Sequence, residues 1–247
     1  MMQIAVISDV HGNLPALEAV AYDIRQRQIE QVLNLGDHAS GPLWPDETVA
    51  FLMAQPWKHI AGNCDRRIVH QDPGSQGASD RFAFERLKAE QKAWLTHLPK
   101  QLRVEPGIML THGTPADDEM YLLEYIEHGR SCLASRGEIE SRLGQVDEPI
   151  LLCGHSHIPR VVVLTRDITI VNPGSVGLPA YHTDFPEPHV METGSPHARY
   201  AILTHRDKRW QIDLVAVEYD NHAAVEQAEK NQRLDWAIAL RIGRTST

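Results

Sequence analysis

Short apolar runs alternate along this chain with longer segments in which apolar side chains recur every three or four positions. Short apolar runs are typical of buried strands, and the wider spacing is typical of helices that pack on a core. The spacing predicts helices over residues 14–28, 45–55, 79–98, 118–128, 131–144 and 222–240. Strands are predicted over residues 3–8, 31–35, 57–61, 101–105, 107–111, 150–153, 160–165, 168–172, 199–205 and 209–219.

The alternation of strands and helices indicates an α/β fold. At 247 residues the chain suits one large domain or two small ones. No long linker or internal repeat divides it, so we expect a single domain over residues 1–247. The polar, proline-rich segment 181–198 is the best candidate for a mobile loop.

Composition limits the class of protein. Three cysteines without a CxxC pair cannot form a disulfide framework or a structural zinc site, which favours a reduced, intracellular setting. The N-terminal apolar run ends at Asp9 and carries no basic leader, so we expect a cytoplasmic protein with no membrane partner. A net charge of −9 argues against general binding to the nucleic-acid backbone.

Five of the apolar runs end in side chains that can bind metal. Because the carboxyl ends of strands line the ligand crevice of open α/β sheets, residues distant in sequence can meet there. The set is rich in oxygen and imidazole donors, which indicates a polar site for two metal ions rather than a thiolate site, and Cys153 is assigned to its strand. The candidate ligands are Asp9, His11, Asp37, Asn63, His112, His155 and His157.

The segments DVHG, GD, GNCD, THG and GHSH follow the order found in the calcineurin-like metallophosphoesterases, which the chain resembles over roughly residues 1–160. The continuation IVNPGSVGLP (170–179) is similar to the small bacterial and archaeal phosphodiesterase-like branch of that family. The resemblance implies a four-layer α/β/β/α sandwich of two mixed β-sheets flanked by helices. It also implies a first metal held by Asp9, His11, Asp37 and His157, and a second held by Asp37, Asn63, His112 and His155.

Two divalent cations can share a bridging water, lower its pKa and clamp the phosphoryl oxygens during attack. We therefore expect a phosphoric-ester hydrolase, a phosphodiesterase or phosphatase, that uses a metal-bridging hydroxide on a small or nucleotide-like substrate. The donors suit Mn, Fe, Ni, Co or Zn without selecting one. His38, Asn63 and His112 are the expected catalytic residues, with His38 as an acid or a phosphate contact.

Cys64 departs from the family pattern, because many members carry His after the metal-binding Asn. A thiol is a poor general acid near neutral pH, and no separate base indicates a nucleophilic role for it. Arg66 and Arg67 follow this motif and could bind phosphate oxygens, although solvated surface arginines explain them equally well.

Other functions remain open. One is hydrolysis of the phosphoanhydride bond of dinucleoside polyphosphates, and another is a non-catalytic protein-interaction scaffold with the same fold. Scaffolds of this kind typically lose metal ligands, whereas every ligand position is filled here. Segments 113–145 and 181–198 are expected to shape the substrate pocket, and the sequence predicts neither the substrate nor the oligomeric state.

Overall fold

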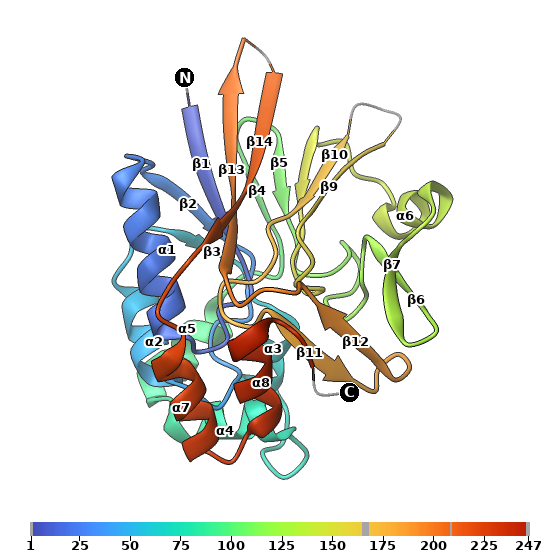
Figure 1. Cartoon of the computed structure of the whole chain (residues 1–247). Helices are drawn as coiled ribbons and strands as arrows, with labels where there is room; N and C mark the ends of the chain where they lie inside the picture. Colours follow the sequence, from blue (N-terminus) through green and yellow to red (C-terminus); the bar gives the residue numbers. More distant parts are fainter. Residues whose placement is uncertain (1, 165–167, 208, 246–247) are drawn as a thin grey trace.

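The computed structural model describes residues 2–164, 168–207 and 209–245, so Thr165 of the predicted strand 160–165 lies outside it (Figure 1). Within these residues the strands form two five-stranded sheets and one four-stranded sheet. In the first sheet β1, β2 and β3 are parallel, whereas β13 and β14 are antiparallel to their neighbours. Its order is β14 (Arg209–Val217), β13 (Ala198–Arg206), β1 (Met2–Ile7), β2 (Gln31–Asn34) and β3 (Lys58–His59).

The second sheet is also mixed, with three parallel central strands and an antiparallel strand at each edge. It contains, in order, β4 (Leu102–Val104), β5 (Ile108–Leu110), β8 (Ile150–Leu152), β10 (Thr169–Asn172) and β9 (Arg160–Val163). Each central strand is a short run of buried apolar residues, as expected for a strand covered on both faces.

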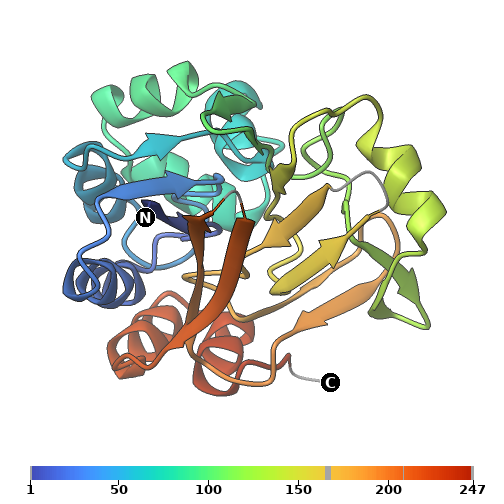
Figure 2. The same ribbon diagram turned by 90° about the horizontal axis from the view of Figure 1, so that it is seen from above.

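The two five-stranded sheets pack face to face, as Figure 2 shows from above. Alternate side chains of a strand point to opposite faces. Ile4 and Val6 of β1 therefore pack against Leu110 and Leu152 of the second sheet. Ile7, on the other face of β1, packs against α1 (Leu14–Gln26). The four-layer sandwich of two mixed sheets is confirmed.

The outer layer of the second sheet differs from the sequence prediction. Helix α6 (Arg136–Leu143) packs there beside a third sheet of order β11 (Ala180–Thr183), β12 (His189–Glu192), β7 (Arg130–Leu133) and β6 (Glu124–Glu127). The prediction of a helix over 118–128 is wrong, because this segment contains β6. The prediction of a helix over 131–144 is right only for α6, because the segment begins in β7. His128 and Gly129 both have positive φ, at 51° and 73°, which is the two-residue turn that suits a β-hairpin.

The segment 181–198, predicted as a loop, also contributes strands. β11 and β12 pair as an antiparallel hairpin over residues 180–183 and 189–192. Polar and proline residues obscure this pairing in the sequence because the hairpin is short and only half-buried.

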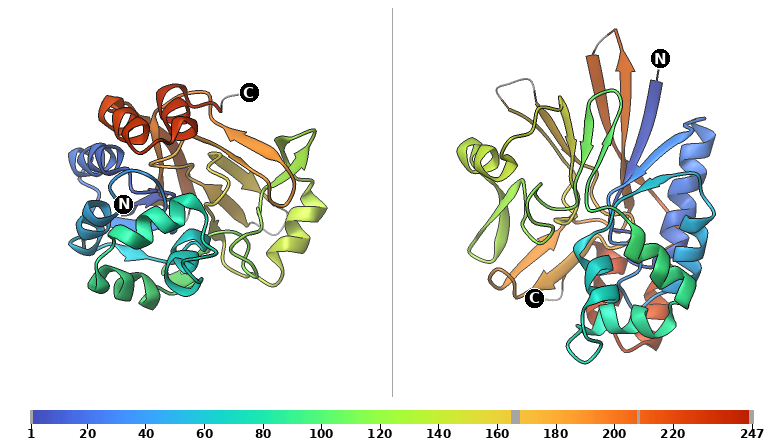
Figure 3. Two further views of the ribbon diagram at one scale, coloured as in Figure 1. Left: turned by 90° about the horizontal axis from the view of Figure 1, so that it is seen from below. Right: turned by 180° about the vertical axis from the view of Figure 1, so that it is seen from behind.

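The remaining helices gather at the end of the sandwich where the strands of the metal motifs finish (Figure 3). They are α2 (Pro45–Met53), α3 (Asn63–His70), α4 (Ala78–Arg86), α5 (Ala89–His97), α7 (His222–Lys230) and α8 (Leu234–Ile242). The predicted helix 79–98 is broken by extended backbone at Leu87 and Lys88. The predicted helix 222–240 is broken at Gln232, whose φ is 59°. None of the described helices is long and apolar enough to cross a bilayer.

Candidate metal centre

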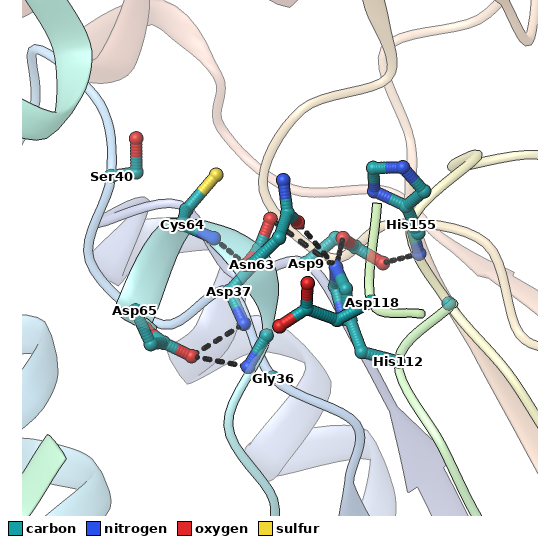
Figure 4. Close-up of polar contacts among 12 residues, drawn as sticks. Asp9, Gly36, Asp37, Ser40, Asn63, Cys64, Asp65, His112, Asp118 and His155 are labelled. Atoms are coloured by element: carbon teal, nitrogen blue, oxygen red, sulfur yellow. Dashed lines mark hydrogen bonds and ion pairs between the residues drawn. The ribbon is translucent and has the colours of Figure 1, made fainter. Parts of the chain in front are cut away.

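The loops that follow β1, β2, β5 and β8 are joined by backbone hydrogen bonds. Asp9 N donates to Gly36 O and His11 N donates to Asp37 O, each at 3.0 Å, which joins the first two loops. Gly154 N donates to His112 O at 2.8 Å, which joins the other two. Side chains from four strand ends thus converge on one point, and Figure 4 shows Asp9, Asp37 and His112 pointing toward one another with Asn63 from α3.

Most of the candidate ligands have left-handed backbone. This conformation is uncommon for residues other than glycine, and it is found where the surrounding structure compels it, often at functional sites. The φ angles are 56° at Asp9, 52° at His11, 56° at Asp37, 65° at His155 and 60° at His157. The backbone therefore turns sharply in the DVHG, GD and GHSH motifs, and these side chains converge where the strands end.

Two glycines of the motifs are required by close packing beside these carboxylates. A Cβ atom on Gly62 would lie 2.1 Å from Asp37 Oδ1. A Cβ atom on Gly154 would lie 2.8 Å from Asp9 Oδ2 and 2.1 Å from Ser8 Oγ. The first residue of GNCD and of GHSH must therefore be glycine for the two Asp side chains to keep their positions.

Three of the imidazoles are oriented by backbone carbonyls. A neutral imidazole that donates through Nδ1 keeps a lone pair on Nε2, and in these rings Nε2 faces the cluster. The Nδ1 contacts are His11 to Ser40 O at 2.7 Å, His112 to Leu35 O at 2.8 Å, and His157 to Leu178 O at 2.7 Å.

The resulting cage of donor atoms fits a divalent cation. His11 Nε2 lies 3.1 Å from His157 Nε2, so two lone pairs repel each other unless a proton or cation lies near both. Asp9 Oδ1 lies 3.2 Å from His157 Nε2 and, among the described residues, accepts no hydrogen bond. Asp37 Oδ2 lies 3.8 Å from His11 Nε2 and 3.5 Å from His112 Nε2. All of these side chains are buried, and buried carboxylates require such partners.

The pKa shifts reflect the same enclosure. Burial alone would raise the pKa of Asp9, but His157 and His112 outweigh it and bring that pKa to about 2. Burial alone would lower the pKa of His112, but Asp37 and Asp9 raise it to about 10. Burial, with His157, lowers the pKa of His11. Burial alone would likewise raise the pKa of Asp37, but His112 and His11 keep it well below its usual range. The site thus holds two ionised carboxylates that attract positive charge, which either a proton on His112 or a bound cation supplies.

Asn63 can present either amide atom to this cage. In one orientation its Oδ1 lies 2.9 Å from His112 Nε2. In the other orientation the amide nitrogen donates to His112 Nε2 at 2.9 Å and the oxygen accepts from Arg67 Nη1 at 2.7 Å. Only the first orientation offers an oxygen ligand to a cation, and it releases Arg67 Nη1 from Asn63.

His155 is held differently from the other three imidazoles. Its Nε2 contacts Glu119 O at 3.0 Å, so Nδ1 is the nitrogen left for a metal. Its backbone N–H donates to Asp9 Oδ2 at 3.2 Å, and its ring stacks on Tyr121 with centroids 4.8 Å apart. Burial and His112 lower its pKa to about 3, so the ring is neutral and able to bind a cation near neutral pH.

Three other predicted site residues have distinct positions. His38 is fully buried, bonds Asp65 Oδ2 through Nδ1 at 2.7 Å and packs against Trp94, a placement that offers no support for an acid or phosphate contact. Arg66 forms ion pairs with Asp118 and Glu119. The side chain of Arg67 is 30% exposed; its Nε donates to Asp80 Oδ2 at 2.8 Å and its Nη1 donates to Glu119 Oε1 at 3.4 Å.

A cavity of about 990 Å³ is lined by five of the candidate ligands, His11, Asp37, Asn63, His155 and His157. Its walls include Arg67 and Cys64 from α3, Tyr121 and Tyr181 from the two segments expected to shape a pocket, and Trp236 from α8. Sequence reasoning did not identify Trp236, because a Trp on an apolar helix face looks the same as a core residue. It also missed Asp65, which accepts hydrogen bonds from Gly62 N, Asp37 N and His38 N.

Comparison with known proteins agrees with this fold. An uncharacterized protein of Methanocaldococcus jannaschii is 28% identical over an alignment of 257 positions, which covers 94% of this chain and 94% of that protein. A metallophosphoesterase from Sphaerobacter thermophilus has a similar structure, with a TM-score of 0.70, 24% identity, and coverage of 96% of this chain and 100% of that one. A hypothetical protein from Pyrococcus horikoshii OT3 gives a TM-score of 0.73 at 20% identity, with both chains fully covered.

The model of the calcineurin-like phosphoesterase superfamily domain matches residues 2–208. This range includes every candidate ligand from Asp9 to His157 and both five-stranded sheets except for β14. The chain belongs to the calcineurin-like phosphoesterase superfamily.

Proposed function

We propose that this protein is a dinuclear metallophosphoesterase that hydrolyses phosphoric esters of small or nucleotide-like molecules. The observation that carries the proposal is the 3.1 Å approach of His11 Nε2 and His157 Nε2 beside the carboxylates of Asp9 and Asp37. Such an arrangement of buried bases and anions is stable when cations lie among them.

The ligand sets would be those that the family resemblance implies. Asp9, His11, Asp37 and His157 would hold one ion, and Asp37, Asn63, His112 and His155 would hold the other. Bound divalent ions would lower the pKa of a coordinated water and neutralise charge on the phosphoryl oxygens. The carbonyls that bond the far nitrogen of each imidazole keep its other nitrogen directed at the ions.

Arg67 is the residue best placed to bind a phosphate oxygen. It lines the cavity beside Asn63, and the ion pair with Asp80 holds its guanidinium in place. When the Asn63 oxygen faces the ligand cage, Arg67 Nη1 no longer bonds Asn63. It then keeps only a 3.4 Å contact with Glu119 Oε1, so one of its two N–H groups can bind a phosphate oxygen. The volume of the cavity is at the upper end of the range for small-molecule sites, so it accommodates more than a single phosphate group.

A metal assay combined with turnover tests this proposal. The purified protein should contain about two divalent ions per chain after loading with Mn, Fe, Ni, Co or Zn, and should hydrolyse bis-p-nitrophenyl phosphate or p-nitrophenyl phosphate. Chelation should abolish the activity and re-addition of metal should restore it. A protein that binds no divalent ion and hydrolyses neither compound would instead be a non-catalytic scaffold with this fold.

A further inference from the structure

Arg66 joins α3 to the loop that follows β5. Its Nε donates to Asp118 Oδ2 at 2.8 Å and its Nη2 donates to Asp118 Oδ1 at 2.7 Å, a two-point ion pair. Nη2 also donates to Glu119 Oε1 at 2.9 Å. The bidentate pairing of guanidinium and carboxylate fixes both orientation and distance. These contacts form one cluster, the Arg66 cluster, which consists of Arg66, Asp118 and Glu119.

The same loop orients His155. The main-chain oxygen of Glu119 accepts from His155 Nε2 at 3.0 Å, and the ring of Tyr121 stacks on the His155 ring. The carbonyl partners of His11 and His112 lie in the strand-end loops that carry the metal motifs themselves. The partner of His155 belongs instead to the loop after β5, which the side-chain contacts of Arg66 tie to α3.

The loop is also packed tightly at its beginning. A Cβ atom on Gly113 would lie 2.6 Å from Asp117 O and 2.7 Å from Met120 O, so residues 117–120 fold directly over the residue that follows His112. Asn63 stands three residues before Arg66 on α3. The Arg66 cluster therefore links the elements that carry Asn63, His112 and His155.

We propose that Arg66 is a positioning residue that fixes His155 through the loop of Asp118 and Glu119, and so raises the affinity for one of two metal ions. This inference rests on the proposed function, because it concerns the ion assigned to Asp37, Asn63, His112 and His155. Without the cluster, the Glu119 carbonyl no longer holds His155 Nε2, and the Nδ1 lone pair loses its fixed direction. Loss of such a supporting contact typically lowers metal affinity about 10–100-fold.

The contacts of Arg66 favour this positioning role over direct binding of the substrate. The edge of its guanidinium that carries Nε and Nη2 is already bonded to two carboxylates. Arg67, but not Arg66, is among the described residues that line the cavity. A phosphate that bound Arg66 would first have to displace Asp118, whereas the positioning role uses the contacts that exist.

Titration of the metal-free protein with Mn²⁺, followed by calorimetry and by electron paramagnetic resonance, tests the inference. In the wild type we expect two binding events and a spin-coupled signal from neighbouring ions. In Arg66→Gln one of the two events should weaken by about 10–100-fold while the other is unchanged. Asp118→Asn should reproduce this shift, and Arg66→Lys, which keeps the charge but not the two-point pairing, should lie between. At saturating Mn²⁺ the KM of Arg66→Gln should equal that of the wild type.

The control is Arg27→Gln, which removes an exposed ion pair with Asp23 far from the cavity and should bind Mn²⁺ as the wild type does. Unfolding by urea shows whether each variant is folded. If Arg66→Gln does not fold, Asp118→Asn takes its place in the test. Unchanged Mn²⁺ affinities with a raised KM would overturn the inference in favour of substrate binding, and equal weakening of both events would also overturn it. A wild type that binds one ion would refute the two-metal assignment; the positioning role then holds only if Arg66→Gln weakens that ion.

Discussion

The backbone N–H of Asp37 donates to Asp65 Oδ2 at 2.8 Å, which ties the candidate bridging ligand to the first turn of α3. The same carboxylate accepts from Gly62 N at 2.9 Å, from His38 N at 3.0 Å and from His38 Nδ1 at 2.7 Å. Asp65 has no exposed surface. It thus joins the loop after β2 to the GNCD motif without being a ligand itself.

Asp65→Asn should lower the free energy of unfolding and should also weaken the hydrogen bond that holds the backbone of Asp37. The amide nitrogen that replaces one oxygen faces backbone N–H donors, so at least one buried donor loses its partner, at a cost of about 1–3 kcal/mol. Urea unfolding of the metal-free protein measures this loss. Leu234→Ala, which truncates a largely exposed side chain on α8, is a control that should leave the free energy of unfolding nearly unchanged. An Asp65→Asn variant as stable as the wild type would show that the Asp65 carboxylate is dispensable for this junction.

Asp37→Asn should abolish turnover and weaken both metal ions. Its carboxylate lies between the imidazoles of His11 and His112 and is the one ligand assigned to both ions, so its negative charge attracts each of them. The loss of affinity should exceed the ~10–100-fold typical of a supporting residue. Metal content after gel filtration and turnover of bis-p-nitrophenyl phosphate measure the two effects. Full activity with two bound ions would end the assignment of Asp37 as a bridge.

Glu124 should make stability depend on pH in the weakly acidic range. Burial raises its pKa from 4.5 to about 6, against the opposing effect of Arg160. Because the folded-state pKa lies above the unfolded one, the folded state favours the protonated form. Glu124 therefore makes its full contribution to the free energy of unfolding below pH 4.5. This contribution, about 2 kcal/mol in all, is lost as the pH rises through 6.

The comparison of wild type with Glu124→Gln isolates this effect. The amide cannot ionise, so the free energy of unfolding of the wild type should fall relative to that of the variant between about pH 4.5 and 6.5. Both proteins are unfolded with urea after removal of metal, so that metal binding does not contribute to the pH dependence. A difference that stays constant over this range would mean that Glu124 titrates normally in the folded protein.

The sequence predicted the central sheets well because their strands are short apolar runs whose ends carry the metal motifs. It failed for β6 and β7, where Tyr125 and Ile126 fit a helical spacing while the decisive signal, the His128-Gly129 turn, is only two residues long. The candidate ligands were selected by their motifs, and the structure brings them together. The partners that orient them, such as Leu178 O and Glu119 O, are backbone atoms without any sequence signature.

Cys64 leads to the last prediction, which concerns leaving groups. Its Sγ accepts from Arg67 Nη2 at 3.0 Å at the cavity wall. Burial, with Asp37, raises the pKa of this thiol well above its usual range, so it is neither a thiolate nucleophile nor an acid suited to neutral pH. Expulsion of a basic alkoxide usually gains ~10²–10⁴-fold from protonation, whereas an aryl oxide or a phosphate needs far less help.

We therefore expect the wild type to hydrolyse aryl esters and nucleotide anhydrides faster than simple alkyl phosphates, with a steep dependence of rate on the pKa of the leaving group. Cys64→Ala should leave aryl-ester turnover largely intact, because no step requires the thiol. Cys64→His should flatten the dependence if the new imidazole reaches the leaving oxygen. Rates for a series of substituted phenyl and alkyl phosphates measure both effects. Loss of nearly all activity in Cys64→Ala, with the fold and both metal ions retained, would demonstrate a catalytic role for the thiol.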